Sequence, residues 1–136
     1  GIVGSTGRMG AHLIKNVLEE EELELAALHV FDELTVDVPA EVLITNSMNE
    51  LLKVCDVVID FSAPVATQEL CEEALKNPTA LVIATTGFTA HQQNLLTEAA
   101  KEMPVLYSSN MSAGIALLKQ LVEQVSATLK DFDIEI

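Results

Sequence analysis

The residues best suited to chemistry lie in a glycine-rich loop near the start of the chain, where positions 4–10 read GSTGRMG. Gly4 permits a tight turn, Gly7 leaves room for a pyrophosphate against the backbone, and Gly10 lets the following helix pack closely on the preceding strand. Free backbone amides at the helix start, together with the helix dipole, form an anion site. The pattern therefore favours dinucleotide binding, and the alternative is a turn used only for tight packing.

A second candidate is the acid that would bind the adenosine ribose. It is expected about 20 residues after such a loop, at the end of the second strand. That strand end reads HVFDE at positions 29–33, so Asp32 is the candidate. The alternative is that Asp32 only begins an acidic loop over positions 32–40, and both interpretations stay open.

Two further loops each follow a predicted strand and precede a predicted helix. They read ATTGF at positions 84–88 and SSNM at positions 108–111. Ligands of open α/β folds bind at the carboxyl ends of the strands, where hydroxyls and exposed amides can meet a nicotinamide or a ribose. Ordinary strand-to-loop turns are the alternative. Convergence of both loops with the glycine loop at one sheet edge favours binding.

The remaining reactive side chains form no recognisable catalytic set. Asp60 ends a strand without a partner acid or base, so we expect it to order its loop by hydrogen bonds. Cys55 and Cys71 are far apart and have no local activating cation, which predicts reduced, partly buried thiols. Three histidines lack metal-ligand spacing and are predicted to be surface or packing residues: His12, His29 and His91. The sequence therefore predicts neither a catalytic residue nor a metal site.

Alternating strands and helices must position these loops. Hydrophobic periodicity predicts strands over positions 2–4, 23–31, 41–45, 56–61, 80–84 and 104–107. It predicts helices over positions 8–20, 49–54, 65–75, 89–103 and 112–129. Strands separated by helices in this way indicate right-handed βαβ units and a parallel sheet. The predicted fold class is α/β, a Rossmann-like doubly wound parallel sheet.

The composition is that of one acidic domain of ordinary size. The 136 residues contain 7 Lys+Arg and 21 Asp+Glu, a formal net charge of −14, and 49% are hydrophobic, which argues against disorder. The acidity disfavours nucleic acid and anionic membranes as partners, so a dinucleotide must be attracted by local donors such as the helix amides and Arg8. Two cysteines, no signal peptide and no bilayer-spanning run predict a cytoplasmic location.

Both ends of the chain read as strand segments. The first residues are already apolar, and positions 133–136 alternate polar and apolar residues. An unpaired strand would leave its backbone groups without partners. We therefore expect this sequence to be a piece of a longer polypeptide.

Together the motifs resemble a known family. The segments, in chain order, are GSTGRMG at 4–10, DVVIDFSAPVAT at 56–67, ATTGF at 84–88, PVLYSSNMSAG at 104–114 and FDIEI at 132–136. They closely resemble the N-terminal part of the dihydrodipicolinate (4-hydroxy-tetrahydrodipicolinate) reductases. The resemblance covers essentially the whole chain, and it is far more specific than the glycines alone.

The resemblance implies an oxidoreductase that uses NADPH or NADH to reduce a cyclic intermediate of diaminopimelate and lysine biosynthesis. It implies a dinucleotide-binding domain over positions 1–111, followed at 112–136 by a hinge helix and the first strand of a truncated substrate and oligomerisation domain. It also implies a homotetramer as the intact protein, with the dinucleotide as the small-molecule partner of this part and the substrate bound mainly by the missing domain.

The same resemblance assigns the cofactor-binding residues. Those around the pyrophosphate are Gly4, Ser5, Thr6, Gly7, Arg8 and Met9. Those along the ribose and nicotinamide are Ala84, Thr85 and Thr86, and those of the nicotinamide-side loop are Ser108, Ser109, Asn110 and Met111. Asp32 remains the candidate for the adenosine ribose.

The chain departs from the family pattern at several positions. Val30 and Phe31 stand where the family usually offers an acid, with Asp32 beyond them, so the choice between NADH and NADPH stays open. Ala84 replaces a more usual glycine, and Ala116 replaces the asparagine of a later motif. The family's His-His-x-x-Lys stretch and Ser-Gly-Thr motif, which grip and protonate the substrate, would follow the last residue given.

We therefore expect the cofactor-binding portion of such a reductase, which would bind a dinucleotide and turn over nothing by itself. One alternative is a non-catalytic dinucleotide-sensing module. Another is the Rossmann half of a different amino-acid-pathway dehydrogenase, such as a semialdehyde or homoserine dehydrogenase. The paired GRMG and TTGF motifs speak against that last alternative.

Overall fold

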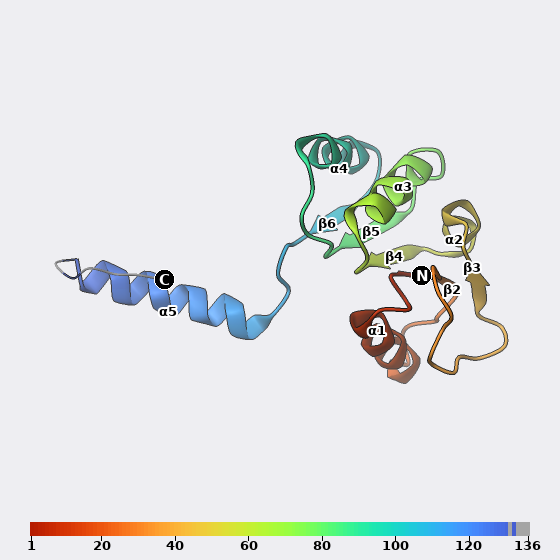
Figure 1. Cartoon of the computed structure of the whole chain (residues 1–136), viewed down its shortest axis with the longest axis horizontal. Coiled ribbons are helices and arrows are strands. Elements are labelled where there is room, and N and C mark those ends of the chain that lie inside the picture. Colours follow the sequence, from red (N-terminus) through yellow and green to blue (C-terminus); the bar gives the residue numbers. More distant parts are fainter. Residues whose placement is uncertain (131, 133–136) are drawn as a thin grey trace.

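A computed structural model of the chain describes residues 1–130 and residue 132 (Figure 1). Its strands and helices follow one another in the predicted order, with a loop instead of a helix between the strands at Ala27–His29 and Leu43–Thr45. The strand expected at positions 133–136, and with it the start of a second domain, lies outside the described residues.

The described strands form a six-stranded parallel sheet in the order β3-β2-β1-β4-β5-β6. The strands are β1 (Ile2–Val3), β2 (Ala27–His29), β3 (Leu43–Thr45), β4 (Val57–Asp60), β5 (Ala80–Ile83) and β6 (Val105–Tyr107). Ile2 in the central strand is in register with Leu28 on one side and with Ile59 on the other. The strand order thus reverses between β1 and β4, as in a doubly wound Rossmann fold. The predicted fold class is confirmed.

The described residues form five helices, four of which lie between strands, while the fifth follows β6: α1 (Arg8–Glu19), α2 (Met48–Val54), α3 (Pro64–Ala74), α4 (Ala90–Glu102) and α5 (Ala113–Thr128). Local signals set their first residues. Pro64 occupies the first turn of α3, where its missing N–H costs nothing. Thr89 and Gln92 form a capping box at the start of α4, since each side chain accepts a hydrogen bond from the other residue's backbone N–H.

The second strand is shorter than the sequence predicts, spanning Ala27–His29 instead of positions 23–31. A strand in a sheet is only as long as the neighbours it pairs with, and β1 offers two residues and β3 three. The hydrogen bonds between β2 and β3 extend one residue beyond each end of β2. At one end the Leu43 N–H donates to Ala26 O, and at the other the Val30 N–H donates to Thr45 O.

Two apolar cores lie on opposite faces of the sheet, because successive strand residues point to opposite sides. Helices α2, α3 and α4 cover one face, and α1 covers the other (Figure 1). The larger core joins Val3, Ala27, Val58, Leu81 and Ile83 of the sheet to Leu51, Leu70 and Leu96 of those three helices. The smaller core joins Ile2 and Leu28 to Ile14 of α1, with Leu25 and Val42 beside them.

Helix α5 stands apart from the rest of the fold. It extends away from the sheet at the end of a short linker (Figure 1). Every residue of α5 belongs to the described part of the chain, and none of them is buried. The predicted helix is confirmed, but its apolar residues, including Ile115, Leu118 and Val125, are about half exposed.

Candidate dinucleotide-binding site

The glycine loop lies between β1 and α1, and two of its glycines are required by the backbone. Gly4 has φ +84°, and a Cβ there would lie 2.4 Å from the carbonyl oxygen of Phe61. A Cβ on Gly10 would lie only 2.2 Å from the carbonyl oxygen of Gly4. The first glycine therefore makes the turn and the third allows α1 to approach the strand, which confirms both structural roles predicted for them.

The start of α1 has the features of an anion site. Gly7 is the N-cap residue, and within the described chain no side chain caps the first turn. The Gly7 N–H donates to Gly4 O at 3.1 Å. The backbone amides that follow, starting with those of Arg8 and Met9, belong to the first turn of α1, where N–H groups have no acceptor inside the helix. A Cβ on Gly7 would meet only Gly4 O, at 3.3 Å, so the space above the loop is open. This space suits a phosphate group.

Ser5 fixes the loop rather than facing the solvent. Its side chain is buried, and its hydroxyl donates to the carbonyl oxygen of His29 at 2.5 Å. This bond ties the glycine loop to the carboxyl end of β2. The Ser5 hydroxyl therefore already has a partner within the protein. Of Ser5 and Thr6, only Thr6 lines an open groove.

Hydrogen bonds beyond the strand ends bring the predicted loops together. Phe61 N–H donates to Val3 O, Ala84 N–H donates to Asp60 O, and Ser108 N–H donates to Ile83 O, all between 2.9 and 3.1 Å. The segments after β1, β4, β5 and β6 consequently lie side by side at the carboxyl edge of the sheet. The expected convergence of the loops is confirmed.

Asp60 is the buried centre of a hydrogen-bond network at this edge. Its carboxylate accepts from the Ser62 N–H at 3.0 Å, from the Thr85 hydroxyl at 3.1 Å, and from the hydroxyls of Ser62 and Thr67. Thr85 also accepts from the Ser62 N–H at 3.0 Å. The network joins the ends of β4 and β5 to α3, which confirms the predicted loop-ordering role of Asp60. The Thr85 hydroxyl is thereby committed to the protein interior.

A first groove, of about 480 Å³, spans the end of β1. We call it the adenosine-side groove. Its lining residues come from the glycine loop, the end of β2 and the start of α3: Val3, Gly4, Thr6, Gly7, His29, Phe31, Asp32, Phe61, Ser62, Ala63, Val65, Ala66 and Glu69. The structure thus brings four predicted site residues together here, namely Gly4, Thr6, Gly7 and Asp32.

A second groove, of about 340 Å³, lies on the other side of Phe61 and is called the nicotinamide-side groove below. Its lining residues are Met9, Phe61, Ala84, Ser109, Asn110, Met111 and Ser112. Five of the seven were predicted as site residues. Phe61 lines both grooves and was missed, although it ends the apolar DVVIDF run at the edge where ligands bind.

Some predicted residues line neither of these two grooves. Arg8 and Thr86 are exposed beside them. Ser108 orders its own loop, since its hydroxyl donates to Asn110 O at 2.9 Å. The Asn110 side chain accepts from the Ser112 N–H at 2.9 Å, so the loop before α5 has a defined shape.

Comparison with known proteins gives the family. The family described as "Dihydrodipicolinate reductase, N-terminus" matches residues 1–111, which include both grooves up to Met111. This chain belongs to the dihydrodipicolinate reductase family. The match favours the resemblance found in the sequence over a semialdehyde or homoserine dehydrogenase.

Named relatives agree with this assignment. The 4-hydroxy-tetrahydrodipicolinate reductase of Sulfurovum sp. (strain NBC37-1) is 96% identical over 136 residues, which is all of this chain and 53% of the relative. That of Sulfurimonas denitrificans is 48% identical over the same length and again 53% of the relative is covered. The chain therefore spans about half the length of the curated relatives it matches.

Solved structures share the fold. A dipicolinate-bound dihydrodipicolinate reductase from Paenisporosarcina sp. TG-14 superposes with a TM-score of 0.74 at 24% identity, covering 93% of this chain and 52% of that chain. A Plasmodium falciparum pyrroline carboxylate reductase with NADP bound has a TM-score of 0.51 at 11% identity, covering 98% of this chain and 70% of that chain. At these sequence identities, the structural similarity shows a shared Rossmann-like fold.

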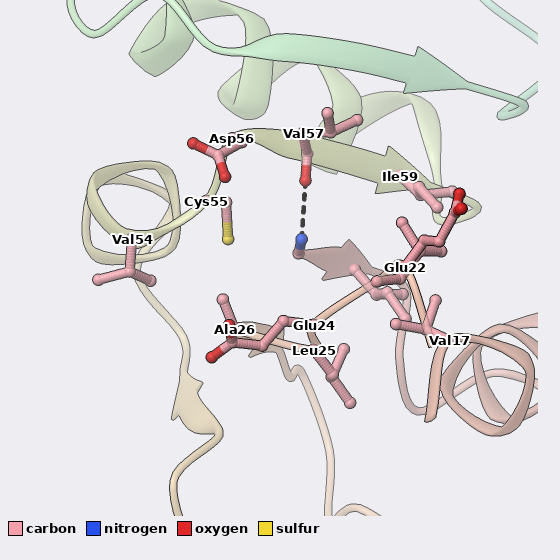
Figure 2. Close-up of a pocket in the computed structure, with 13 residues that line it drawn as sticks. Val17, Glu22, Glu24, Leu25, Ala26, Val54, Cys55, Asp56, Val57 and Ile59 are labelled. Carbon is pink, nitrogen blue, oxygen red and sulfur yellow. Dashed lines mark hydrogen bonds between the residues drawn. The ribbon is translucent and has the colours of Figure 1, made fainter. Parts of the chain in front are cut away.

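A larger hollow, of about 500 Å³, lies at the amino ends of the strands, on the opposite side of the sheet from the two grooves (Figure 2). There the amino group of Gly1 donates to Val57 O at 2.7 Å. Glu22, Glu24 and Asp56 line the hollow, so its carboxylates repel a pyrophosphate. It faces the amino ends of the strands, away from the loops where ligands of this fold bind.

Both cysteines are free, as predicted, and Cys71 is unsuited to nucleophilic chemistry. Cys71 is buried, and burial, with smaller contributions from the charges of Asp60 and Glu72, raises the pKa of its thiol to about 12. Cys55 is half-buried.

Over residues 1–130 and 132, no three potential ligands among His, Cys, Asp and Glu cluster in a way that could hold a metal ion. In the same part of the chain, no helix is both long and apolar enough to cross a membrane.

Proposed function

We propose that this chain is the cofactor-binding portion of an NAD(P)H-dependent reductase of 4-hydroxy-tetrahydrodipicolinate in the diaminopimelate and lysine pathway. The observation that carries the proposal is the family match over residues 1–111, which coincides with a glycine loop opening onto two grooves at one sheet edge. A dinucleotide has two nucleoside halves joined by a pyrophosphate. Two grooves flanking an anion site suit that shape.

The residues present fit such a cofactor. The open space above Gly7 and the first amides of α1 would hold the pyrophosphate. The adenosine half would lie against Asp32, with Thr6 beside it, and the nicotinamide half against Ala84 and the loop at positions 109–111. Through Ser62 and Thr85, the Asp60 network would hold the β4 and β5 loops in position.

When bound, the cofactor supplies a hydride from its nicotinamide ring. The protein's contribution in this half is orientation: it fixes where the ring lies and which groups surround it. Met9, Phe61 and Met111 would give the ring an apolar surface in the nicotinamide-side groove. Proton donation and binding of the substrate would fall to the part of the polypeptide beyond this chain.

The wider assignments are part of the same proposal. We propose a dinucleotide-binding domain over positions 1–111, with α5 as a hinge helix that leads into a substrate and oligomerisation domain. The intact protein would be a cytoplasmic homotetramer with no nucleic-acid or membrane partner. A net charge of −14 supports the absence of polyanionic partners.

Calorimetric titration of the chain with NADH and NADPH tests the proposal. The parent chain should bind at least one of them, and Gly7→Asp should weaken binding at least tenfold, because a carboxylate would fill the space meant for the pyrophosphate. Gly114→Asp is the matched control, since Gly114 lies in α5, where an added Cβ meets only ordinary contacts. Equal binding by the parent and Gly7→Asp, with circular dichroism unchanged, would place the cofactor elsewhere.

The reaction itself requires the longer polypeptide. We expect no turnover from the 136-residue chain by itself. Joined to the C-terminal half of the Sulfurovum relative, which is 96% identical over this region, the chain should support reductase activity. A folded chimera that binds the dinucleotide but leaves 4-hydroxy-tetrahydrodipicolinate unreduced would contradict the assigned substrate.

A further inference from the structure

The nicotinamide-side groove is lined by two of the four methionines in the chain, Met9 and Met111. Met9 lies in the first turn of α1, and Met111 lies in the loop between β6 and α5. That loop has a defined shape, because the Asn110 side chain accepts from the Ser112 N–H at 2.9 Å and so spans Met111. Two thioethers from distant parts of the sequence therefore meet in one groove.

Solvent reaches these two methionines but not the other two. Met9 is 48% exposed and Met111 is 43% exposed, whereas Met48 is 1% exposed and Met103 is 6% exposed. Met48 and Met103 belong to the larger apolar core. An oxidant dissolved in water must reach the sulfur, so exposure favours oxidation of the groove methionines over the core methionines.

The other residues of the groove lining are Phe61, Ala84, Ser109, Asn110 and Ser112. Within the described chain, this lining has neither a cysteine nor a charged side chain. The two thioethers are therefore its most readily oxidised groups. They also supply much of its apolar, polarisable surface.

The two cysteines lie outside this groove. Cys71 is buried, and burial raises the pKa of its thiol to about 12, so little reactive thiolate is present at neutral pH. Cys55 lines the hollow at the amino ends of the strands (Figure 2). Oxidation of a cysteine would therefore leave the lining of the nicotinamide-side groove unchanged.

We propose that Met9 and Met111 form a modification site, where oxidation by hydrogen peroxide weakens binding of the nicotinamide half of the cofactor. The inference rests on the proposed function, and it adds how cofactor binding at this site is regulated. The sulfur attacks one peroxide oxygen, so that an S–O bond forms while the O–O bond breaks. The departing hydroxide takes the proton of the new S–OH group and leaves as water. The sulfur is oxidised by two electrons to a sulfoxide, and the peroxide is reduced by the same two electrons.

The sulfoxide changes what the groove offers to a nicotinamide ring. A thioether is apolar, whereas a sulfoxide carries an acceptor oxygen that needs a hydrogen-bond partner. Covering that oxygen with an aromatic ring, without a partner, costs free energy. Oxidation should spare the adenosine half, because neither Met9 nor Met111 lines the adenosine-side groove.

The experiment treats the 136-residue chain with hydrogen peroxide, removes the oxidant, and locates the sulfoxides by peptide mass spectrometry. Met9 and Met111 should be oxidised well before Met48 and Met103. Calorimetry is then repeated with whichever of NADH and NADPH the untreated chain binds more tightly. Its dissociation constant should rise about fivefold or more, while that of ADP-ribose, which lacks the nicotinamide, should stay within about twofold. Methionine sulfoxide reductases A and B should restore binding, and dithiothreitol alone, which reverses cysteine oxidation, should not.

The double variant Met9→Leu/Met111→Leu tests the two sulfurs directly. Leucine keeps an apolar side chain of similar volume but has nothing to oxidise, so the affinity of this variant, whatever its starting value, should not change on treatment. Met48→Leu/Met103→Leu is the matched control. It keeps both groove methionines, so peroxide should weaken its cofactor binding as it does for the parent.

The remaining outcomes separate this inference from the proposed function. Oxidation of Met9 and Met111 without loss of cofactor affinity overturns the inference and leaves the proposed function standing. An equal loss in Met9→Leu/Met111→Leu, or for ADP-ribose, also overturns it, because the damage would then lie outside the groove. Equal oxidation of Met48 and Met103 contradicts the difference in exposure on which it depends. Binding of neither NADH nor NADPH by the untreated, folded chain overturns the proposed function, and this inference with it.

Discussion

Helices α3 and α5 carry similar apolar patterns, yet they meet different surroundings. Leu70, Cys71 and Ala74 of α3 are completely buried against the sheet. Ile115 and Leu118 of α5 have the same spacing, but both are about half exposed. The comparison shows that periodicity identifies a helix and its apolar face, while the partner of that face comes from the topology of the chain.

The two regions should therefore differ in how they resist unfolding. The sheet and helices α1–α4 share two continuous cores, so they should unfold as one cooperative unit. Helix α5 has 16 residues and no buried side chain among its described residues, so its stability is mostly local. Helices of that length are marginal without tertiary packing.

Removing a large apolar side chain from each helix should show the largest contrast. Leu70→Ala should lower the free energy of unfolding by about 2–5 kcal/mol, because it leaves a cavity in the core. Leu118→Ala should change it by less than about 0.5 kcal/mol, because Leu118 is exposed and alanine favours helix. Urea titrations of both variants measure the difference. A comparable loss in Leu118→Ala would mean that α5 packs on a surface.

Neutralising an acid should come next in size. Asp60→Asn should cost about 2–3 kcal/mol of unfolding free energy, because the carboxylate that organises four donors is replaced by an amide that must itself donate. Glu123→Gln on the exposed surface of α5 should stay within about 0.5 kcal/mol. The same titrations measure both. An unchanged midpoint in Asp60→Asn would show that the network tolerates a neutral centre.

Adding one methyl group should give opposite signs in the two regions. Gly10→Ala should cost about 1–3 kcal/mol, because the new Cβ overlaps the backbone of the glycine loop. Gly114→Ala should leave the core unaffected and stabilise α5 by up to about 1 kcal/mol, because alanine favours helix and the new Cβ would lie 3.7 Å from the Ser112 hydroxyl oxygen, an ordinary contact. Thermal melts followed by circular dichroism measure both. Equal stability of Gly10→Ala and the parent would contradict the tight packing of α1.

Removing a helix cap should give the smallest contrast. Thr89→Ala deletes the capping box of α4 and should lower the global free energy of unfolding by about 1 kcal/mol. Ser112→Ala deletes the cap of α5, where the Ile115 N–H donates to the serine hydroxyl. There we expect faster hydrogen exchange of the α5 amides and an unchanged global midpoint. A shifted global midpoint in Ser112→Ala would show that α5 and the core unfold together.

Local signals in the sequence predicted much of the fold and part of the site. The turn at Gly4, the capping box at Thr89 and the start of α3 at Pro64 depend on residues a few positions apart, so they could be read directly. The parallel sheet followed from the alternation of strands and helices. The carboxyl-edge loops were then expected to converge, and they do.

Other features depend on which surfaces the fold places opposite one another. Phe61 and Glu69 line the adenosine-side groove only because β4 lies next to β1, a neighbour far away in the sequence. The hydroxyls of Ser5 and Thr85 point to protein partners, His29 O and Asp60, that no local pattern identifies. Residue types at a strand end thus indicate a site, but the direction of each side chain comes from tertiary contacts.

The central position of β1 has a consequence for how the chain folds as it is synthesised. Ile2 pairs with Ile59, so the middle of the sheet cannot close until the chain has grown past β4. At roughly 5–20 residues per second this interval lasts roughly 3–11 s. During that time β1 can pair only with β2, and its other edge stays open to wrong partners. The central strand of the finished sheet is thus an exposed edge early in translation, when a chaperone would protect it most effectively.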